Sequence, residues 1–168
     1  MESGDRPWNY SIEFETWVAA SQHVNSSIGA KFATTLGLLT KVGRSGFSNN
    51  LREGLGLYKY VGGHHIHAKA AFKQHATYNL RNGLSISNPM MKSLGLDHGA
   101  MTAFQRRAFR DLNASGAPNS LKAHTQIAVG ALQAGGASKG MARTLATQSL
   151  LNLRSQGVRF PSNIPWYK

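Results

Sequence analysis

The chain has 168 residues, with 19 lysine and arginine residues against 7 aspartate and glutamate residues and a formal net charge of +12. A chain of this length can bury a core as one compact domain, and its lack of cysteine excludes disulfides, thiolate zinc sites and a cysteine nucleophile. Any metal ion must therefore be held by histidine, asparagine and carboxylate side chains.

The excess positive charge lies in the part of the chain after residue 53. Residues 1–53 hold five basic and five acidic side chains. Residues 54–168 hold fourteen basic side chains against Asp97 and Asp111, so the whole +12 (14 − 2) lies there. Such a field attracts polyanions, of which nucleic-acid phosphates are the commonest in a cell. We therefore expect an N-terminal helical lead-in and linker over 1–53 and a functional domain over 54–168.

The first predicted elements are helices over 11–22 and 27–40, followed by the linker "GRSGFSNN" at 43–50. Short strands are predicted over 56–61 ("GLYKYV") and 83–87 ("GLSIS"), with a turn or two of helix between them at 68–76.

From residue 88 onward the sequence is helical in every window. The predicted helices begin at Asn88, with Asn as the N-cap and Pro89 in the first turn, at residue 101, at Asn119 and at Ser138. The one from residue 101 carries an apolar face of Met101, Phe104, Ala108, Phe109 and Leu112. An extended tail follows Gly157 and is expected to be packed by Trp166. The fold class is therefore α+β and mostly helical.

No stretch reads as a targeting or membrane-spanning segment. The N-terminus is acidic, and the longest weakly apolar run, at 28–43, is interrupted by Lys31, threonines and glycines. We expect a chain without a membrane segment. If it acts outside its own cell, a longer parent protein or a carrier supplies its export.

A histidine cluster follows the first predicted strand of the basic region, in "YKYVGGHHIHAKAAF" at 58–72. In an extended chain His65 and His67 share one face and His64 points to the other. Gly62 and Gly63 can take positive φ and turn the chain, which allows His64 and His65 to approach one small site. Of the other histidines, His67 and His75 are about evenly balanced between a functional and a structural role, His124 is expected to be structural, and His23 is discounted.

Two adjacent imidazoles suit phosphodiester hydrolysis, in which one holds a metal ion and the other accepts a proton from water. A neutral imidazole is a competent base near pH 7, and a divalent ion stabilises charge on the phosphoryl oxygens. Further ligands could come from "SNPMMKSLGLDHG", which offers Asn88, Asp97 and His98. A plain zinc site from His65 and His67 is a weaker alternative.

Basic side chains supply candidate phosphate contacts. Arg106, Arg107 and Arg110 cluster on the helix that contains Phe104, and Lys69 and Lys73 follow the histidines. No phosphate-binding glycine loop and no nucleophile elbow occurs in the sequence.

The motifs "GGHHIHAKAAF", "NGLSISN" and "DHGAMT" resemble the HNH/endonuclease VII superfamily, and more narrowly the GHH-signature nuclease toxins of bacterial polymorphic toxin systems. The resemblance spans about residues 56–168. It implies a ββα-metal core followed by a helical C-terminal part. It also implies that His64 is a metal ligand, His65 the general base, His98 a second ligand and Asn88 a third, with Asn82 or Asp97 as alternatives to Asn88.

The resemblance further implies a metal-dependent endonuclease that cleaves DNA in preference to RNA and leaves 5′-phosphate and 3′-hydroxyl ends. Its ion would be magnesium first, with manganese, zinc or nickel as alternatives. Such a domain is delivered into the cytoplasm of a competitor cell, as the C-terminal part of a larger secreted protein or bound to a carrier. It acts as a monomer and is neutralised by an acidic immunity protein, which binds fast through electrostatic steering.

Two other functions stay open at this point. A non-catalytic nucleic-acid-binding module would use the basic helices and keep the histidines as structural residues. A metal-free RNase toxin would use His65 and another histidine as an acid/base pair and leave cyclic phosphate products.

Overall fold

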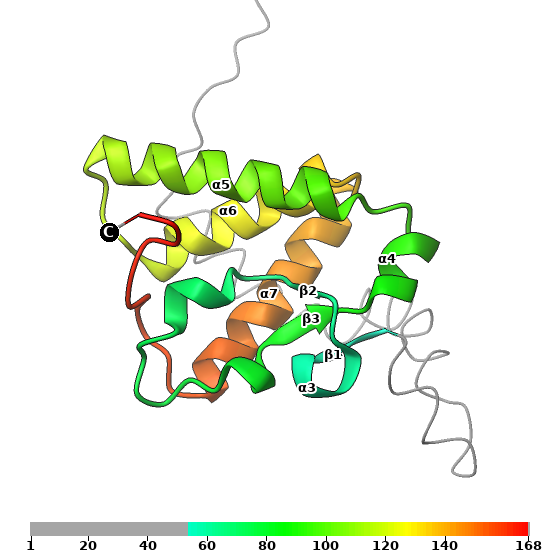
Figure 1. Ribbon diagram of the computed structural model, residues 1–168, viewed down its shortest axis with the longest axis horizontal. Helices are drawn as coiled ribbons and strands as arrows, with labels where there is room; N and C mark the ends of the chain where they lie inside the picture. Colours follow the sequence, from blue (N-terminus) through cyan, green and yellow to red (C-terminus); the bar gives the residue numbers. More distant parts are fainter. Residues whose placement is uncertain (1–53, 168) are drawn as a thin grey trace, which may run out of the picture. The chain divides into compact units, whose positions relative to one another are not determined.

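The computed structural model describes residues 54–167 (Figure 1). The elements, in chain order, are β1 (Leu55–Leu57), α3 (Tyr58–Val61), β2 (His64–His65), η3 (Lys69–Phe72), η4 (Leu80–Asn82), β3 (Leu84–Ile86), α4 (Asn88–Ser93), α5 (His98–Ser115), α6 (Leu121–Ala134) and α7 (Lys139–Ser155). The predicted helices over 11–22 and 27–40, the linker and His23 lie outside the described residues.

A small antiparallel sheet with the strand order β1-β3-β2 precedes the helices. In the central strand β3, Ile86 pairs with Leu55 on one side and with His64 on the other, and Ser85 pairs with His65. The strand predicted over 83–87 is therefore confirmed. Its central position explains the burial of Ser85 and Ile86, both of which are fully buried.

The strand predicted over 56–61 is right at its start and wrong at its end. β1 stops at Leu57, and Tyr58–Val61 forms the helical turn α3. The N–H of Tyr58 donates to the Gly83 carbonyl at 2.9 Å, and the N–H of Gly62 donates to the Tyr58 carbonyl at 2.8 Å. These hydrogen bonds override the β-propensity of the aromatic and β-branched residues.

Gly62 and Gly63 complete the reversal that brings the chain to the other side of β3. Their φ angles are 62° and 74°, in the left-handed region that was expected for this pair. A Cβ atom at Gly63 would lie 2.0 Å from the carbonyl oxygen of Ile86. Glycine is therefore required for β2 to approach β3 and present His64 and His65 beside it.

Helices α4 to α7 begin at serine or aspartate side chains that cap their first turns. The predicted cap at Ser138 is confirmed. The predicted start of α4 at Asn88 is right, but its N-cap is Ser87 and not Asn88. The start predicted at Asn119 is corrected, because α6 has Ser120 as its N-cap. The short hydroxyl side chain of serine reaches the free N–H groups of the first turn in both places.

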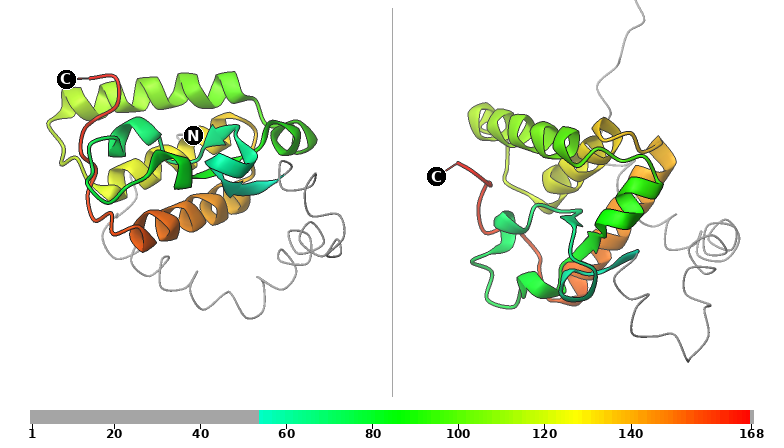
Figure 2. Two further views of the ribbon diagram at one scale, coloured as in Figure 1. Left: turned by 60° about the horizontal axis from the view of Figure 1, so that its bottom comes forward. Right: turned by 45° about the vertical axis from the view of Figure 1, so that its right-hand side comes forward.

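The long helices lie side by side, with α6 between α5 and α7, as Figures 1 and 2 show from three directions. The main core joins Met101, Leu132 and Leu145 from these helices to Ile86 of the sheet and Ile66. On α5 the predicted apolar face is right in part, since Met101 and Phe109 are buried and the other three residues are partly buried. Gln105, which was not predicted there, is buried as well.

A second, smaller cluster lies where the C-terminal tail meets η3. Phe72, Leu153 and Val158 are its buried members, together with Ala71. The tail is held by a hydrogen bond from the Ser162 hydroxyl to the Ala71 carbonyl at 2.8 Å. The expectation that Trp166 packs the tail is right in part, because Trp166 contacts the Phe109 ring but is 49% exposed, whereas Pro165 is buried.

The described fold is thus α+β and mostly helical, as predicted. Among residues 54–167, no helix combines the length and apolar character that crossing a bilayer requires.

Candidate active site

Strand β2 presents two adjacent histidines to different neighbours. Both side chains are buried, with 6% of His64 and 8% of His65 exposed. Because successive side chains of a strand point to opposite faces, the two rings lie on opposite sides of β2. His64 contacts the start of α5, and His65 contacts α3 and η4.

The His64 ring meets the ring of His98, the first residue of α5, edge to face at 5.0 Å between centroids. The Nε2 atom of His64 is buried, and no described protein group bonds to it. Burial, together with the nearby His98 and His65, lowers the pKa of His64 to about 4. At neutral pH this imidazole is therefore uncharged and carries a lone pair, which is the form that binds a metal ion.

The His65 ring is held on two sides. Its Nε2 lies 3.1 Å from the Leu80 carbonyl, and its ring stacks on Tyr58 at 4.3 Å between centroids. A carbonyl oxygen can only accept, so Nε2 must carry the proton and Nδ1 must carry the lone pair. Burial lowers the pKa of His65, which the Leu80 hydrogen bond partly opposes and Lys69 reinforces. His65 is thus neutral near pH 7, with Nδ1 as its basic atom.

The space around His65 is closed on the side of η4. A Cβ atom at Gly83 would come within 2.4 Å of the Tyr78 hydroxyl and 2.8 Å of the His65 ring. Gly83 therefore allows Tyr78 and His65 to approach the same stretch of backbone. The Lys69 ammonium lies 5.1 Å above the Tyr58 ring, which carries a positive charge to the edge of this site.

The η4 segment that supplies the Leu80 carbonyl is fastened to the end of α7 by Gln156. The Gln156 side chain accepts from the Asn79 N–H at 3.3 Å and donates to the Asn82 carbonyl at 3.1 Å. Sequence reasoning missed Gln156, Tyr58 and Leu80. Gln156 lies far from the histidines in the sequence, and Tyr58 carries no charge that would single it out. Leu80 acts through its backbone carbonyl.

The third histidine of the motif is a structural residue. The Thr125 hydroxyl donates to the Leu121 carbonyl at 2.7 Å, so its oxygen accepts from Nε2 of His67 at 3.0 Å. Nδ1 of His67 must then accept from the Ser149 hydroxyl at 2.8 Å. With both nitrogens satisfied, His67 ties the loop after β2 to α6 and α7.

The two remaining described histidines lie away from His64 and His65. His124 bonds to the Asn119 side chain at 2.7 Å and packs between Phe72 and Phe109. His75 bonds to Thr77 next to it in the chain. These contacts favour structural or local roles for both.

The structure brings His64 and His98 together, and it does not bring the other predicted ligands to them. Asp97 caps α5 by accepting from the Ala100 N–H at 3.0 Å, and Asn88 is exposed at the start of α4. The Asn82 carbonyl, rather than its side chain, is the group that braces the loop. Within residues 54–167, no three His, Asp or Glu side chains gather closely enough to hold a metal ion by themselves.

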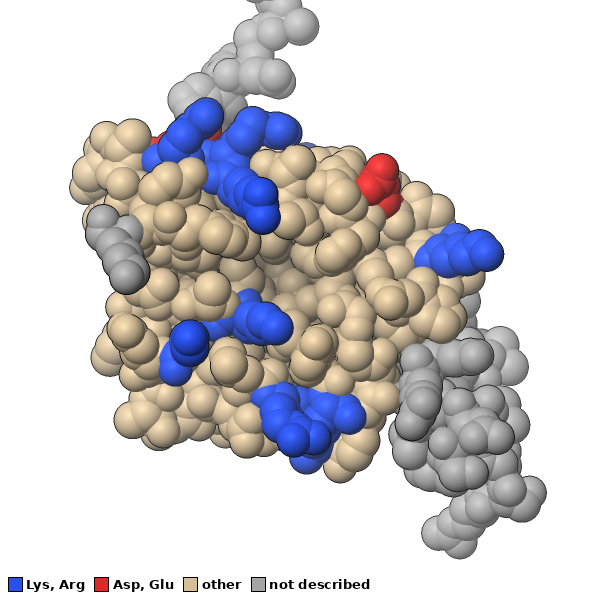
Figure 3. Space-filling model, viewed as in Figure 1, with Lys and Arg blue, Asp and Glu red and all other residues tan. Residues whose placement is uncertain are grey.

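The side chains predicted to contact phosphates are all exposed. Lys69 lies on η3 and Lys73 just after it, and the three arginines lie on α5. Figure 3 shows basic side chains on both sides of a hollow in the face that Figure 1 presents, with acidic ones scarce. Arg110 forms an exposed ion pair with Asp111 at 3.0 Å, and Arg106 lies over the Trp166 ring. Arg107 extends from the same helix.

Comparison with known sequence families, curated proteins and solved structures finds no match to this chain. Its chemistry must therefore be argued from the site itself. That site offers one buried lone pair beside a second imidazole, an oriented neutral base, and a basic face.

Proposed function

We propose that residues 54–168 form a metal-dependent endonuclease of the HNH type that hydrolyses DNA, with RNA as the less favoured substrate. The observation that carries this proposal is that the two histidines of β2 have different hydrogen-bonding partners. Nε2 of His64 is buried without a partner beside His98, whereas Nε2 of His65 is fixed to the Leu80 carbonyl and leaves Nδ1 as a base.

His64 and His98 would hold the metal ion, with oxygen atoms from water and the phosphate filling its other positions. When bound, the ion would stabilise negative charge on the phosphoryl and leaving oxygens. Imidazole ligands favour zinc, nickel and related transition ions, whereas magnesium favours oxygen ligands. The two-histidine pair therefore moves our proposal from magnesium toward a transition-metal ion.

We propose an in-line displacement, in which the attacking water and the leaving oxygen lie on opposite sides of the phosphorus. Nδ1 of His65 takes a proton from the attacking water, whose oxygen bonds to the phosphorus. The bond to the 3′ oxygen breaks, and that oxygen takes a proton from solvent. The products are a 5′-phosphate and a 3′-hydroxyl.

The basic face would hold the substrate backbone around this site. Lys69 and Lys73 lie on the side of η3, and the arginines of α5 extend the positive surface. Contacts of this kind position the phosphate backbone of the substrate without reading its sequence. We therefore propose cleavage with little sequence preference.

The proposal extends to the biology of such a nuclease. A domain with this charge and activity would endanger its producer, so we infer an acidic immunity protein that covers the basic face. We further infer that the nuclease acts as a monomer in the cytoplasm of a target cell, after delivery within a larger protein or on a carrier.

The test is cleavage of supercoiled plasmid by purified protein with magnesium, manganese, zinc, nickel or EDTA. We expect nicking that requires an ion and is lost in His65→Ala, while His75→Ala, the matched control outside the site, nicks as well as wild type. DNA binding without cleavage in the presence of every metal would show that the protein is a binding module and not an enzyme. RNA cleavage in EDTA that leaves cyclic phosphate products would show that the protein is a metal-free RNase.

A further inference from the structure

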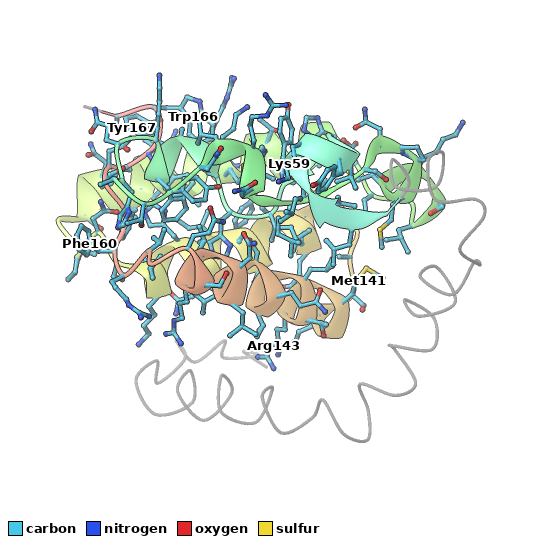
Figure 4. All side chains as sticks on the ribbon, turned by 90° about the horizontal axis from the view of Figure 1, so that it is seen from below. Lys59, Met141, Arg143, Phe160, Trp166 and Tyr167 are labelled. Carbon is cyan, nitrogen blue, oxygen red and sulfur yellow. The ribbon has the colours of Figure 1, made fainter. Side chains whose placement is uncertain are left out.

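The C-terminal tail presents an exposed aromatic ring that the proposed chemistry does not use. Trp166 is 49% exposed, although it follows the buried Pro165. Figure 4 shows Trp166 and Tyr167 on the same side of the fold as Lys59, with Met141 and Arg143 on the opposite side. The indole thus faces the side on which Figure 3 shows the basic hollow.

The backbone at Trp166 is in a conformation that favours glycine. The Tyr167 N–H bonds to the Ile164 carbonyl at 3.3 Å, which closes a four-residue turn with Pro165 and Trp166 at its centre. The φ angle of Trp166 is 65°, and among residues 54–167 every other positive φ belongs to glycine. Glycine or asparagine is the stable choice at the third position of such a turn. A tryptophan there costs stability, and such strain is typical of sites that hold a ligand.

The Trp166 ring also packs against α5. The Trp166 and Phe109 ring centroids are 5.8 Å apart, and the Arg106 guanidinium carbon lies 5.9 Å from the Trp166 centroid. Phe109 is buried and fixes the position of the indole, while Arg106 is exposed and places a positive charge beside it. An exposed ring next to a cation matches a nucleobase and its phosphate.

We propose that Trp166 and Arg106 form a stacking site for an unpaired nucleobase, so that single-stranded or frayed nucleic acid is the preferred substrate. A base inside a duplex has no free face to offer, whereas an unpaired base stacks on the indole. Arg106 and Phe109 lie 8 and 11 residues beyond His98 on α5, which is about 12–16 Å along the helix axis. A strand of a few nucleotides therefore reaches from Trp166 to the histidines.

This inference rests on the proposed nuclease for its substrate, and its test measures binding apart from cleavage. In EDTA, fluorescence anisotropy would follow a labelled oligothymidine strand and a hairpin duplex of equal charge. Trp166→Gly keeps the positive-φ turn and removes the ring, Trp166→Phe keeps a ring, and Phe160→Ala is the control at another exposed aromatic residue of the tail.

We expect Trp166→Gly to weaken single-strand binding by roughly 5- to 150-fold, the loss of one stacked base, and to leave duplex binding unchanged. Trp166→Phe should restore most of the affinity, and Phe160→Ala should bind as wild type. Equal losses for strand and duplex, or no loss in Trp166→Gly, would overturn the stacking site even if the protein cleaves DNA. A selective loss in a protein that cleaves nothing would leave the stacking site standing and overturn the nuclease.

Discussion

His64 and His67 belong to one four-residue motif and are about equally buried, with 6% and 3% of their surfaces exposed, yet their surroundings differ. His67 has a hydroxyl partner on each ring nitrogen, from Ser149 and Thr125. His64 has a buried nitrogen with no described partner and a second imidazole beside it. Burial therefore does not distinguish these histidines. His124 also has a buried ring nitrogen without a partner, so what sets His64 apart is its ring contact with His98.

The largest expected effect comes from removing the base. His65→Ala should lower the rate of plasmid nicking by about 100- to 10,000-fold, the usual contribution of a positioned general base, and leave DNA affinity nearly unchanged. Single-turnover cleavage and anisotropy measure the two quantities. Retention of the wild-type rate would assign the base to another residue.

The contrast between His64 and His67 predicts that replacing each by alanine lowers the free energy of unfolding by different amounts. His67→Ala should lower the free energy of unfolding by about 3–4 kcal/mol, because it opens a cavity, leaves the buried Ser149 hydroxyl unpaired and removes the donor to the Thr125 oxygen. His64→Ala should cost half of that or less without metal, because it removes an atom that has no partner. Urea unfolding gives both values, and equal costs would contradict the contrast.

A metal titration sharpens the same comparison. Zinc or nickel should raise the melting temperature of the wild type and of His75→Ala and leave that of His64→Ala unchanged, because an ion that binds the folded state stabilises it by mass action. Differential scanning fluorimetry measures these shifts. An equal rise in all three proteins would place the ion elsewhere.

The buried structural histidines also predict a loss of stability in mild acid. Burial lowers the pKa of His67 to about 3 and that of His124 to about 4, from an ordinary value of 6.5. Above pH 6.5 both are neutral whether the chain is folded or not. As the pH falls below 6.5 the unfolded chain binds protons that the folded chain does not, so stability falls by up to about 1.4 kcal/mol per pH unit for each residue.

Unfolding by urea at pH 7.5 and 5.5 measures this effect, which amounts to roughly 3 kcal/mol for the two residues together. His64, whose pKa is also lowered to about 4, adds a similar amount, so replacing His124 by leucine should reduce the difference by about 1.4 kcal/mol. A pH difference that is the same with and without His124 would show that other groups cause the acid sensitivity.

The smallest expected effect is that of the residue that positions the base. Gln156→Ala should lower kcat about 10-fold and leave KM for DNA unchanged, because the η4 segment that orients His65 through Leu80 loses its attachment to α7. Gln148→Ala, an exposed position on the same helix, is the matched control. A change in KM alone would assign Gln156 to substrate binding.

The sequence predicted those parts of the molecule that depend on local pattern. The helical region, the strand over 83–87, the cap at Ser138 and the turn at Gly62 and Gly63 follow from periodicity and from the conformations that serine and glycine favour. The boundary between β1 and α3 was missed because Gly83, far along the chain, accepts the hydrogen bond from Tyr58.

The sequence indicated which histidines form the candidate site, but not how their rings are oriented. The spacing of "GGHHIH" indicated His64 and His65, but nothing local indicates that His67 bonds to residues 58 and 82 positions away. The same limit applies to Gln156, whose neutral side chain has no chemical signature of its own. Trp166 was expected to pack the tail because large apolar side chains usually do, and the turn at Pro165 leaves it 49% exposed.

The hydrogen bonds of Gln156 have a consequence for the synthesis of the chain. Its side chain bonds to the Asn82 carbonyl, 74 residues earlier, so the segment that orients His65 stays unattached until the end of α7 has left the ribosome. The tail reaches back as well, from Ser162 to Ala71. A ribosome-bound chain would therefore carry His65 before the segment that orients its ring is attached to the rest of the fold.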